Sequence, residues 1–239
     1  IRKIIVGQDK VISLLLAAIL ADGHVLIEGV PGIAKTLIAK LIAKTISAGF
    51  SRIQFTPDLM PSDILGTSVF NMKNSNFEFN RGPIFSNIIL IDEINRAPAK
   101  TQSALFEVME ERQVTIDGKS YKMEFPFAVF ATQNPIEHEG TYKLPEAQLD
   151  RFLFKVEMDY PSLDEELKIL LDLHKRKDVN DINIIDPVFS KKLLQKLREQ
   201  VRSVHIDEKV ASYIAQIVNN TRNNNDLISA GHQGLLFLS

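Results

Sequence analysis

The sequence predicts an α/β fold: a central parallel β-sheet with helices on both sides, an αβα arrangement with inserted β-hairpins, followed by a small all-helical domain. Up to residue 160, short aliphatic segments of strand length alternate with segments of helical periodicity. A glycine-bearing loop joins the first of these strands to a helix. After Pro161 the strand-like segments stop and amphipathic helical patterns continue. We therefore expect a phosphate-binding domain over residues 1–160 and a helical domain over residues 161–239.

The composition is that of an ordinary globular protein. Of the 239 residues, 45% are hydrophobic and 24% are charged, which allows a sizeable core. The 28 basic and 30 acidic side chains give a formal net charge of −2, which disfavours an obligate nucleic-acid binder. The chain has no cysteine, which excludes disulfides and thiolate metal sites and fits a cytoplasmic location. We see no signal peptide, no apolar stretch long enough to span a membrane, and no metal-ligand spacing among the histidines.

The first elements frame the loop. Helical spacing of apolar residues predicts a helix over Gln8–Asp22. The aliphatic run His24–Glu28 reads as a short buried strand. After the loop, apolar residues from Leu37 to Thr45 recur at helical spacing, and Ala48-Gly49 marks the end of that second helix.

The loop itself is Gly29–Thr36, with the sequence GVPGIAKT. Between a strand and a helix, such a loop points its backbone N–H groups at phosphate oxygens, and the helix N-terminus adds a partial positive charge. Lys35 is expected to reach the β- and γ-phosphates of a nucleotide, and the Thr36 hydroxyl to bind Mg²⁺. The alternative is a plain strand-turn-helix corner with a chance Lys-Thr pair.

Ala34 departs from the usual pattern, which has glycine before the lysine. A left-handed backbone at an alanine costs about 1–2 kcal/mol, so we expect Ala34 to have a negative φ. Gly32, two residues earlier, can supply an unusual backbone angle instead.

A second strand and a hairpin follow. Ser51–Phe55 reads as a short strand, and Pro61–Gly66 as a helical turn with proline before it and glycine at its end. The segment 67–79 contains two strand-like runs separated by Lys73–Asn76, which predicts a β-hairpin with a polar tip.

Two carboxylates end the most apolar strand. Ile88–Ile91 consists of four aliphatic residues, as expected for a parallel strand buried on both faces, and Asp92 and Glu93 follow directly. Ligand sites of α/β sheets lie at this carboxyl edge. We expect Asp92 to hold Mg²⁺ and Glu93 to polarise the attacking water as general base. The alternative is a strand end whose charges are neutralised by salt bridges.

The next strand ends in an amide. A helix is predicted over Ala99–Glu111, and Asp117-Gly118 predicts a tight hairpin turn. The apolar segment Phe125–Ala131 reads as a strand, and Asn134 lies three residues beyond it. Asn134 could orient the attacking water, or it could be an ordinary turn residue before proline.

Arg151 lies between a predicted short helix, 144–152, and a strand, 152–157. Arginine suits bidentate contact with phosphate, but a salt bridge to Asp150 or Glu146 is an equal alternative.

Helices account for the rest of the chain. Ser162 and Glu165 form a capping box that opens a helix to about His174. Two more amphipathic helices are predicted, over Pro187–Val201 and Asp207–Asn219.

Taken together, the motifs resemble the MoxR-type AAA+ ATPases, closely over residues 1–160 and loosely beyond. The segments that carry the resemblance are GVPGIAKT, QFTPDLMPSDILG, RGPIF, DEINRAPAKTQSALFEVMEERQV and ATQNPIEHEGTYKLPEAQLDRF. Alanine before the loop lysine is usual in that family. The resemblance implies an ATP and Mg²⁺ site in which Asn134 is sensor 1 and Arg151 an arginine finger for a neighbouring subunit. It implies nucleotide-binding residues at Val6, Gly7, Gln8, Gly29, Pro31, Gly32, Ile33, Ala34, Lys35, Thr36 and Leu37.

The resemblance also implies a homo-oligomer, typically a hexameric ring, that remodels protein clients as a chaperone or helps insert cofactors or metals. The partners often contain von Willebrand A domains. The 67–79 hairpin resembles the insert that lines the central opening of the ring. The helical domain would be the lid, but Ser229–Gly234, where the family has a sensor 2 arginine, contains none. We therefore assign no sensor 2 and expect the lid to be divergent or incomplete.

Two other classes of function share the same phosphate chemistry. A nucleic-acid motor, such as a helicase or clamp-loader relative, is disfavoured by the near-neutral charge and the lack of interleaved aromatic and basic residues. A nucleotide-dependent binding module with little turnover is disfavoured by the presence of Lys35, Asp92, Glu93 and Arg151.

Overall fold

The computed structural model describes residues 1–2, 4–134, 142, 144–175, 182 and 185–223. Its centre is a sheet of five parallel strands in the spatial order β2-β5-β8-β1-β9. The strands are β1 Val25–Gly29, β2 Phe50–Gln54, β5 Ile88–Asp92, β8 Ala128–Gln133 and β9 Phe154–Met158. The expected parallel α/β sheet is therefore confirmed.

Strand β5 shows how the sheet is buried on both faces. Ile88 and Leu90 pack into the apolar cluster on one side, and Ile89 and Ile91 into the cluster on the other, because successive strand side chains point to opposite faces. The helices that close these clusters are α1 Asp9–Leu20 and α2 Lys35–Thr45 on the first side and α4 Ala99–Glu111 on the second. The sheet is thus the middle layer of an αβα arrangement.

His24, just before β1, joins the sheet to helix α4 through two hydrogen bonds. Its Nδ1 accepts a hydrogen bond from the Val129 N–H at 2.9 Å, so Nε2 carries the proton and donates to the Met109 carbonyl at 3.2 Å. Complete burial, with Arg112 nearby, lowers the pKa of His24 to about 3. This histidine is a neutral structural group.

Strand β8 begins later than the apolar pattern of Phe125–Ala131 predicts, at Ala128. Pro126 has no N–H to give to a ladder. The side chain of Asn87 instead donates to the carbonyls of Glu124 and Pro126, at 3.2 and 2.9 Å. Regular pairing starts at Ala128, whose N–H bonds to the Asn87 carbonyl.

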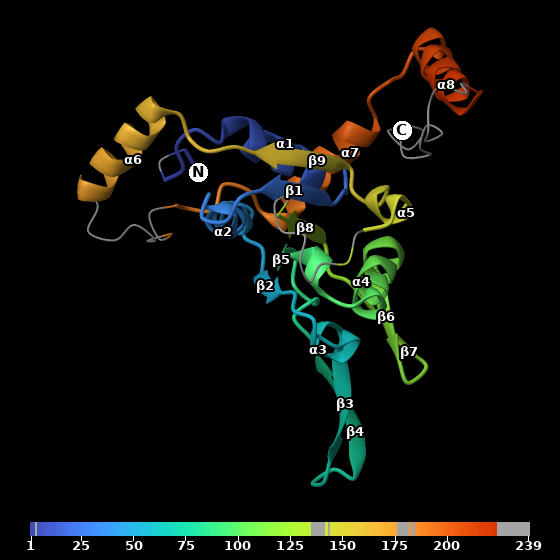
Figure 1. Cartoon of the computed structure of the whole chain (residues 1–239). Coiled ribbons are helices and arrows are strands. Elements are labelled where there is room, and N and C mark those ends of the chain that lie inside the picture. The colour runs from blue at the N-terminus through green and yellow to red at the C-terminus, as the bar shows by residue number, and fades with distance from the viewer. Residues whose placement is uncertain (3, 135–141, 143, 176–181, 183–184, 224–239) are drawn as a thin grey trace.

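Two β-hairpins lie side by side outside the central sheet. One consists of β3 Gly66–Asn71 and β4 Asn76–Arg81, preceded by the short helix α3 Pro61–Leu65, and the other of β6 Gln113–Ile116 and β7 Lys119–Lys122. Asp117 and Gly118 have φ of 50° and 74°, as a type I′ turn requires. Both hairpins were predicted, and Figure 1 shows β3–β4 projecting away from the sheet.

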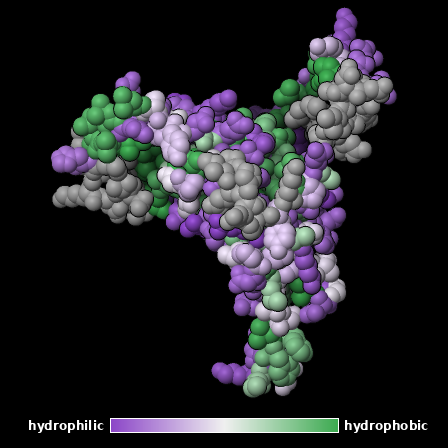
Figure 2. Space-filling model, viewed as in Figure 1, coloured by the Kyte–Doolittle hydropathy of each residue, from purple (hydrophilic) through white to green (hydrophobic). Residues whose placement is uncertain are grey.

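The hairpins are joined at the base of β3–β4. The rings of Phe79 and Tyr121 lie 4.5 Å apart, and the Ser68 hydroxyl donates to the Asp117 carboxylate. Beyond this base the hairpin carries exposed apolar side chains: Val69, Phe70, Met72 and Phe77. Figure 2 shows the apolar tip, and a second apolar surface on α6.

The short helix α5 Glu146–Leu149 lies between β8 and β9. After β9 follow α6 Leu163–Lys175, α7 Lys191–Arg202 and α8 Glu208–Asn223. The capping box of α6 is present, since Glu165 Oε2 accepts from the Ser162 N–H at 2.8 Å and the Glu165 N–H donates to Ser162 Oγ at 3.4 Å. None of the helices in the described ranges is long and apolar enough to cross a membrane.

Helix α7 begins four residues later than the predicted Pro187, because residues 188–189 form backbone hydrogen bonds with the end of α2. The N–H groups of Val188 and Phe189 both donate to the Thr45 carbonyl at the end of α2, at 2.8 and 3.0 Å. Ser190 then caps the helix by accepting from the Leu193 N–H at 3.2 Å. Ile185 and Leu194 join the core cluster of α1 and α2, so this part of the chain packs on the αβα layers. A domain boundary near residue 160 stays a prediction, and Ser229–Gly234 lies outside the described residues.

Candidate functional site

The predicted phosphate loop lies between the end of β1 and the start of α2. Lys35 is the first residue of that helix, and its Nζ donates to the Gly29 carbonyl at 2.7 Å. The lysine therefore folds back over the loop and stands at the positive end of the helix dipole. Partial burial lowers the pKa of Lys35, and the negative charges of Asp92 and Glu93 act in the opposite direction.

Ala34 contradicts the expectation of a negative φ. Its dihedral angles are φ 62° and ψ 21°, in the left-handed region, at a strain of about 1–2 kcal/mol. Ala34 is the N-cap of α2: Ile33 before it is buried, and the Ala34 carbonyl accepts the first helical hydrogen bond, from the Ile38 N–H at 3.0 Å. The change from packed loop to helix therefore falls on Ala34. Gly32, with φ 90°, supplies the other unusual angle, as predicted.

A cavity of about 670 Å³ opens beside the loop, at the carboxyl ends of β1, β5 and β8. It brings together five predicted residues: Lys35, Thr36, Asp92, Glu93 and Asn134. These positions are up to about 100 residues apart in the sequence, and the parallel strands collect them at one edge of the sheet.

Asp92 is held by two neighbours that the sequence did not suggest. Arg52 Nε donates to Asp92 Oδ2 at 2.6 Å, and the Thr132 hydroxyl donates to Asp92 Oδ1 at 3.3 Å. The carboxylate is thus fixed at the end of β5, facing the cavity.

The Glu93 side chain is held by contacts with Gln54 and Arg96. Its Oε2 accepts from Gln54 Nε2 at 2.8 Å and pairs with Arg96 Nε at 3.1 Å. Its N–H donates to the Thr132 hydroxyl at 3.0 Å, and its backbone is left-handed, with φ 58°. A strained backbone persists where the surroundings over-determine it, and here the contacts on both sides of Glu93 do so.

Arg52, Gln54, Arg96 and Thr132 were not predicted as site residues. The signal for two of them is the alternation along β2: Gln54 pairs with Asp92 across β2–β5, and Arg52 lies two residues earlier, on the same face. Reading that signal requires the strand order, which the sequence pattern does not contain.

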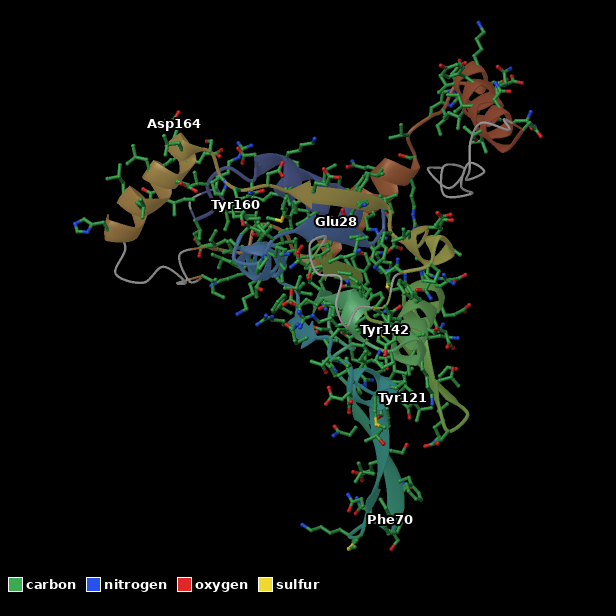
Figure 3. The ribbon with its side chains drawn as sticks, in the orientation of Figure 1. Glu28, Phe70, Tyr121, Tyr142, Tyr160 and Asp164 are labelled. Atoms are coloured by element: carbon green, nitrogen blue, oxygen red, sulfur yellow. The ribbon has the colours of Figure 1, made fainter. Side chains whose placement is uncertain are left out.

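A second cavity, of about 360 Å³, continues from the first. Both are lined by Pro31, Gly32, Ala34 and Leu37. The second is largely apolar and is closed by residues from three segments: Ile4, Ile5, Val6, Gln8, Ile33, Tyr160, Pro161, Ile169 and Asp172. Figure 3 shows Tyr160 at the end of β9, between the sheet and α6.

The segment 6–8 is anchored against this second cavity. Gln8 Nε2 donates to the Asp159 carbonyl at 3.2 Å. Gly7 has φ 81°, and a β-carbon there would lie 2.5 Å from the carboxyl carbon of Glu165. The backbone angle therefore favours glycine here, while the flexible end of the Glu165 side chain could move to make room for a β-carbon.

Arg151 is not among the described residues that line either cavity. It pairs with Glu110 of α4, at 2.7 Å between Nη2 and Oε2, a partner that was not considered from the sequence. Its guanidinium also lies 5.8 Å from the Phe106 ring centre.

The donor set fits a nucleotide with Mg²⁺. Mg²⁺ prefers oxygen ligands and is commonly held by one or two protein groups together with substrate phosphates. The Thr36 hydroxyl and the Asp92 carboxylate, which line one cavity with Lys35, provide such oxygens. The apolar second cavity, reached along the same loop, suits a base.

Comparison with known proteins agrees with this geometry. Residues 24–154 match the family described as ATPases associated with various cellular activities (AAA). The chain is 51% identical to the uncharacterised protein YeaC of Bacillus subtilis, covering 93% of this chain and 68% of that protein. It is 46% identical to Chaperone MoxR1 of Mycobacterium tuberculosis, over 93% of this chain and 58% of that one.

Among solved structures, a crystal structure from Cytophaga hutchinsonii superposes with a TM-score of 0.82 at 47% identity. The match covers 92% of this chain and 66% of that one. The described chain thus spans roughly three fifths to two thirds of the length of these relatives. On the strength of these matches and of the sheet and loop that precede them, the chain belongs to the MoxR-type AAA+ ATPases.

Proposed function

We propose that this chain binds ATP with Mg²⁺ and hydrolyses its γ-phosphate. The single observation that carries the proposal is the meeting of Lys35, Thr36, Asp92, Glu93 and Asn134 around one cavity. In this assignment the loop Gly29–Ala34 and Lys35 cradle the phosphates, and Thr36 and Asp92 hold the metal ion. The segment Val6, Gly7 and Gln8 flanks the base, with Ile33 and Leu37 on the other side of the second cavity.

Glu93 acts as the general base in this mechanism, and Asn134 orients the attacking water. The Glu93 carboxylate accepts a hydrogen bond from Gln54 and forms an ion pair with Arg96, so it must exchange these partners for the water before it can accept a proton. Mg²⁺ would neutralise developing negative charge on the phosphates when bound. Asp92 must share its carboxylate between that ion and Arg52, which holds Oδ2 at 2.6 Å.

We further propose that Arg151 completes the site of a neighbouring copy. Its absence from the described lining of both cavities supports this role, because an arginine finger contacts a γ-phosphate bound by a neighbouring subunit. Subunits joined in this way form a head-to-tail ring, for which a hexamer is the size we expect. Residues 1–160 would be the nucleotide domain and 161–239 the lid of each subunit.

The ring would act as a cytoplasmic, chaperone-like remodeller of protein clients, including proteins with von Willebrand A domains or partners that receive a cofactor or metal. The name of the relative Chaperone MoxR1 supports the chaperone role. The exposed apolar tip of the β3–β4 hairpin supports contact with another protein, since such patches commonly mark interaction sites.

The test is the separation of nucleotide binding from hydrolysis by two variants. Lys35→Ala should weaken binding of a fluorescent ATP analogue, and Glu93→Gln should bind it normally but hydrolyse ATP at least about a hundredfold more slowly. Lys119→Ala, on an exposed hairpin, is the matched control. Unchanged affinity in Lys35→Ala would refute the phosphate loop, and full turnover by Glu93→Gln would refute the general base.

A further inference from the structure

Arg151 is held by contacts from two helices of its own chain. Its Nε and Nη2 both donate to Glu110 Oε2, at 3.0 and 2.7 Å, and its Nη1 donates to the Ala147 carbonyl at 3.2 Å. The buried ring of Phe106 lies beneath the guanidinium, with 5.8 Å between the ring centre and the guanidinium carbon. Glu110 and Phe106 belong to α4 and Ala147 to α5, so the side chain is fixed between two elements.

These contacts leave donors for an anion. A guanidinium has five N–H groups in one plane. The three hydrogen bonds engage one N–H on each nitrogen, and among the described residues no further partner is recorded for the second N–H of Nη1 or of Nη2. Each of these two remaining N–H groups can donate to a phosphate oxygen. The Arg151 side chain is 34% exposed, which lets an anion approach from outside the chain.

The ion pair itself adds little to folding, because the Glu110 side chain is 59% exposed and water screens the attraction. Its effect is on orientation. Arginine has many rotamers, and a contact with phosphate must otherwise select one of them at the moment of reaction. A guanidinium already fixed in one orientation avoids that entropic cost and raises the rate through positioning.

We propose that Glu110 is the positioning residue for Arg151, and that it turns the two remaining N–H groups toward the γ-phosphate in the cavity of the adjacent copy. This inference rests on the proposed function, in which Arg151 acts across a subunit interface.

The experiment is a mixture of two inactive proteins. Arg151→Ala subunits keep a complete cavity but provide no finger, and Glu93→Gln subunits provide the finger but no general base. If Arg151 acts across the interface, the mixture hydrolyses ATP although neither protein does so alone. Glu110→Gln is then added to one of the two proteins at a time.

We expect Glu110→Gln to lower the kcat of the mixture about tenfold or more when the Glu93→Gln subunits carry it, with KM unchanged. The same change in the Arg151→Ala subunits should have no effect, because they have no finger to orient. Glu111→Gln, at the next exposed carboxylate of α4, is the matched control and should be neutral in both proteins.

The outcomes are distinguishable. A mixture that stays inactive without Glu110→Gln refutes the proposed interface site, and with it this inference. An active mixture that keeps its full rate, or gains activity, when the Glu93→Gln subunits carry Glu110→Gln refutes the positioning role alone. An equal loss in both arrangements would also refute it, because a merely structural residue has no reason to depend on which subunit supplies the finger.

Discussion

At the scale of single residues, Ala34 joins a phosphate loop to a helix while its backbone is left-handed, with φ 62°. Ala34→Gly should raise the free energy of unfolding by about 1 kcal/mol, because glycine adopts this conformation without the strain of a β-carbon. Urea denaturation measures the effect. Ala43→Gly, in the buried middle of α2, is the control and should destabilise the protein by about 1 kcal/mol. A loss of stability in Ala34→Gly would mean that the loop is not strained at this residue.

His24 makes the fold sensitive to acid. Its pKa is near 3 in the folded chain and 6.5 in the unfolded one, so between these values only the unfolded chain takes up the proton. Stability attributable to His24 is therefore complete above about pH 6.5 and falls as the pH decreases, by about 2 kcal/mol between pH 7 and pH 5.

Unfolding free energies at pH 7 and pH 5 test this effect. We expect His24→Gln to show a smaller loss between the two pH values than the unchanged chain, by about 2 kcal/mol. His205→Gln, at an exposed histidine, should keep the full loss. Equal losses in all three proteins would exclude His24 as the source.

A sequence reveals a site residue when the segments that define its role are neighbours in the chain. Lys35 and Thr36 could be predicted because the strand, loop and helix that define them are contiguous. Arg52 and Thr132 could not, because their importance comes from lying beside Asp92 in a strand order that the chain reaches only when folded. The prediction of a negative φ at Ala34 was wrong, because the junction of loop and helix holds a left-handed conformation that alanine does not prefer by itself.

At the scale of elements, α7 is attached to the sheet layers through one carboxylate. Asp22, just after α1, forms an ion pair with the buried Arg198 of α7 and another, at 3.4 Å, with Arg112. Arg198 also lies over the Phe125 ring, at 4.9 Å, and burial lowers the pKa of Arg198 to about 10. Arg202, also of α7, lies 3.8 Å from the same carboxylate. A single acidic group thus faces three guanidinium groups at the junction of three segments.

Asp22→Asn should therefore destabilise the protein by about 1–3 kcal/mol, because it leaves a buried cation without its counter-charge. Asparagine keeps the tolerance for the left-handed backbone found at Asp22, so the effect isolates the charge. Asp9→Asn, which breaks an exposed pair with Arg2, should change stability by less than about 0.5 kcal/mol. Equal effects of the two variants in urea denaturation would contradict this account.

Most elements could be predicted because periodicity and turn residues are local signals, as in α4 and at Asp117-Gly118. The boundaries that differ were displaced by distant partners. The Asn87 side chain donates to the carbonyls that precede β8, and the Thr45 carbonyl accepts from the N–H groups that precede α7. The attachment of α7 to α1 through Asp22 also had no sequence signal, since it joins segments that are far apart in the chain.

At the scale of the whole molecule, the placement of Arg151 predicts how activity depends on assembly. We expect the Mg²⁺-ATPase rate per subunit to rise steeply with protein concentration, because in the proposed ring each site receives its arginine from a neighbour. Sizing the protein at each concentration is the accompanying measurement. A substantial rate that stays constant in a sample shown to be monomeric would contradict the arginine's role across an interface.

The junction of the two hairpins has a mechanical consequence. Strand β2, whose Arg52 and Gln54 touch Asp92 and Glu93, leads through α3 directly into β3. The contacts of Phe79 with Tyr121 and of Ser68 with Asp117 stiffen the base of the β3–β4 hairpin. Six residues of strand are about 20 Å long, so a small tilt at the base of the hairpin would become a larger displacement at its apolar tip.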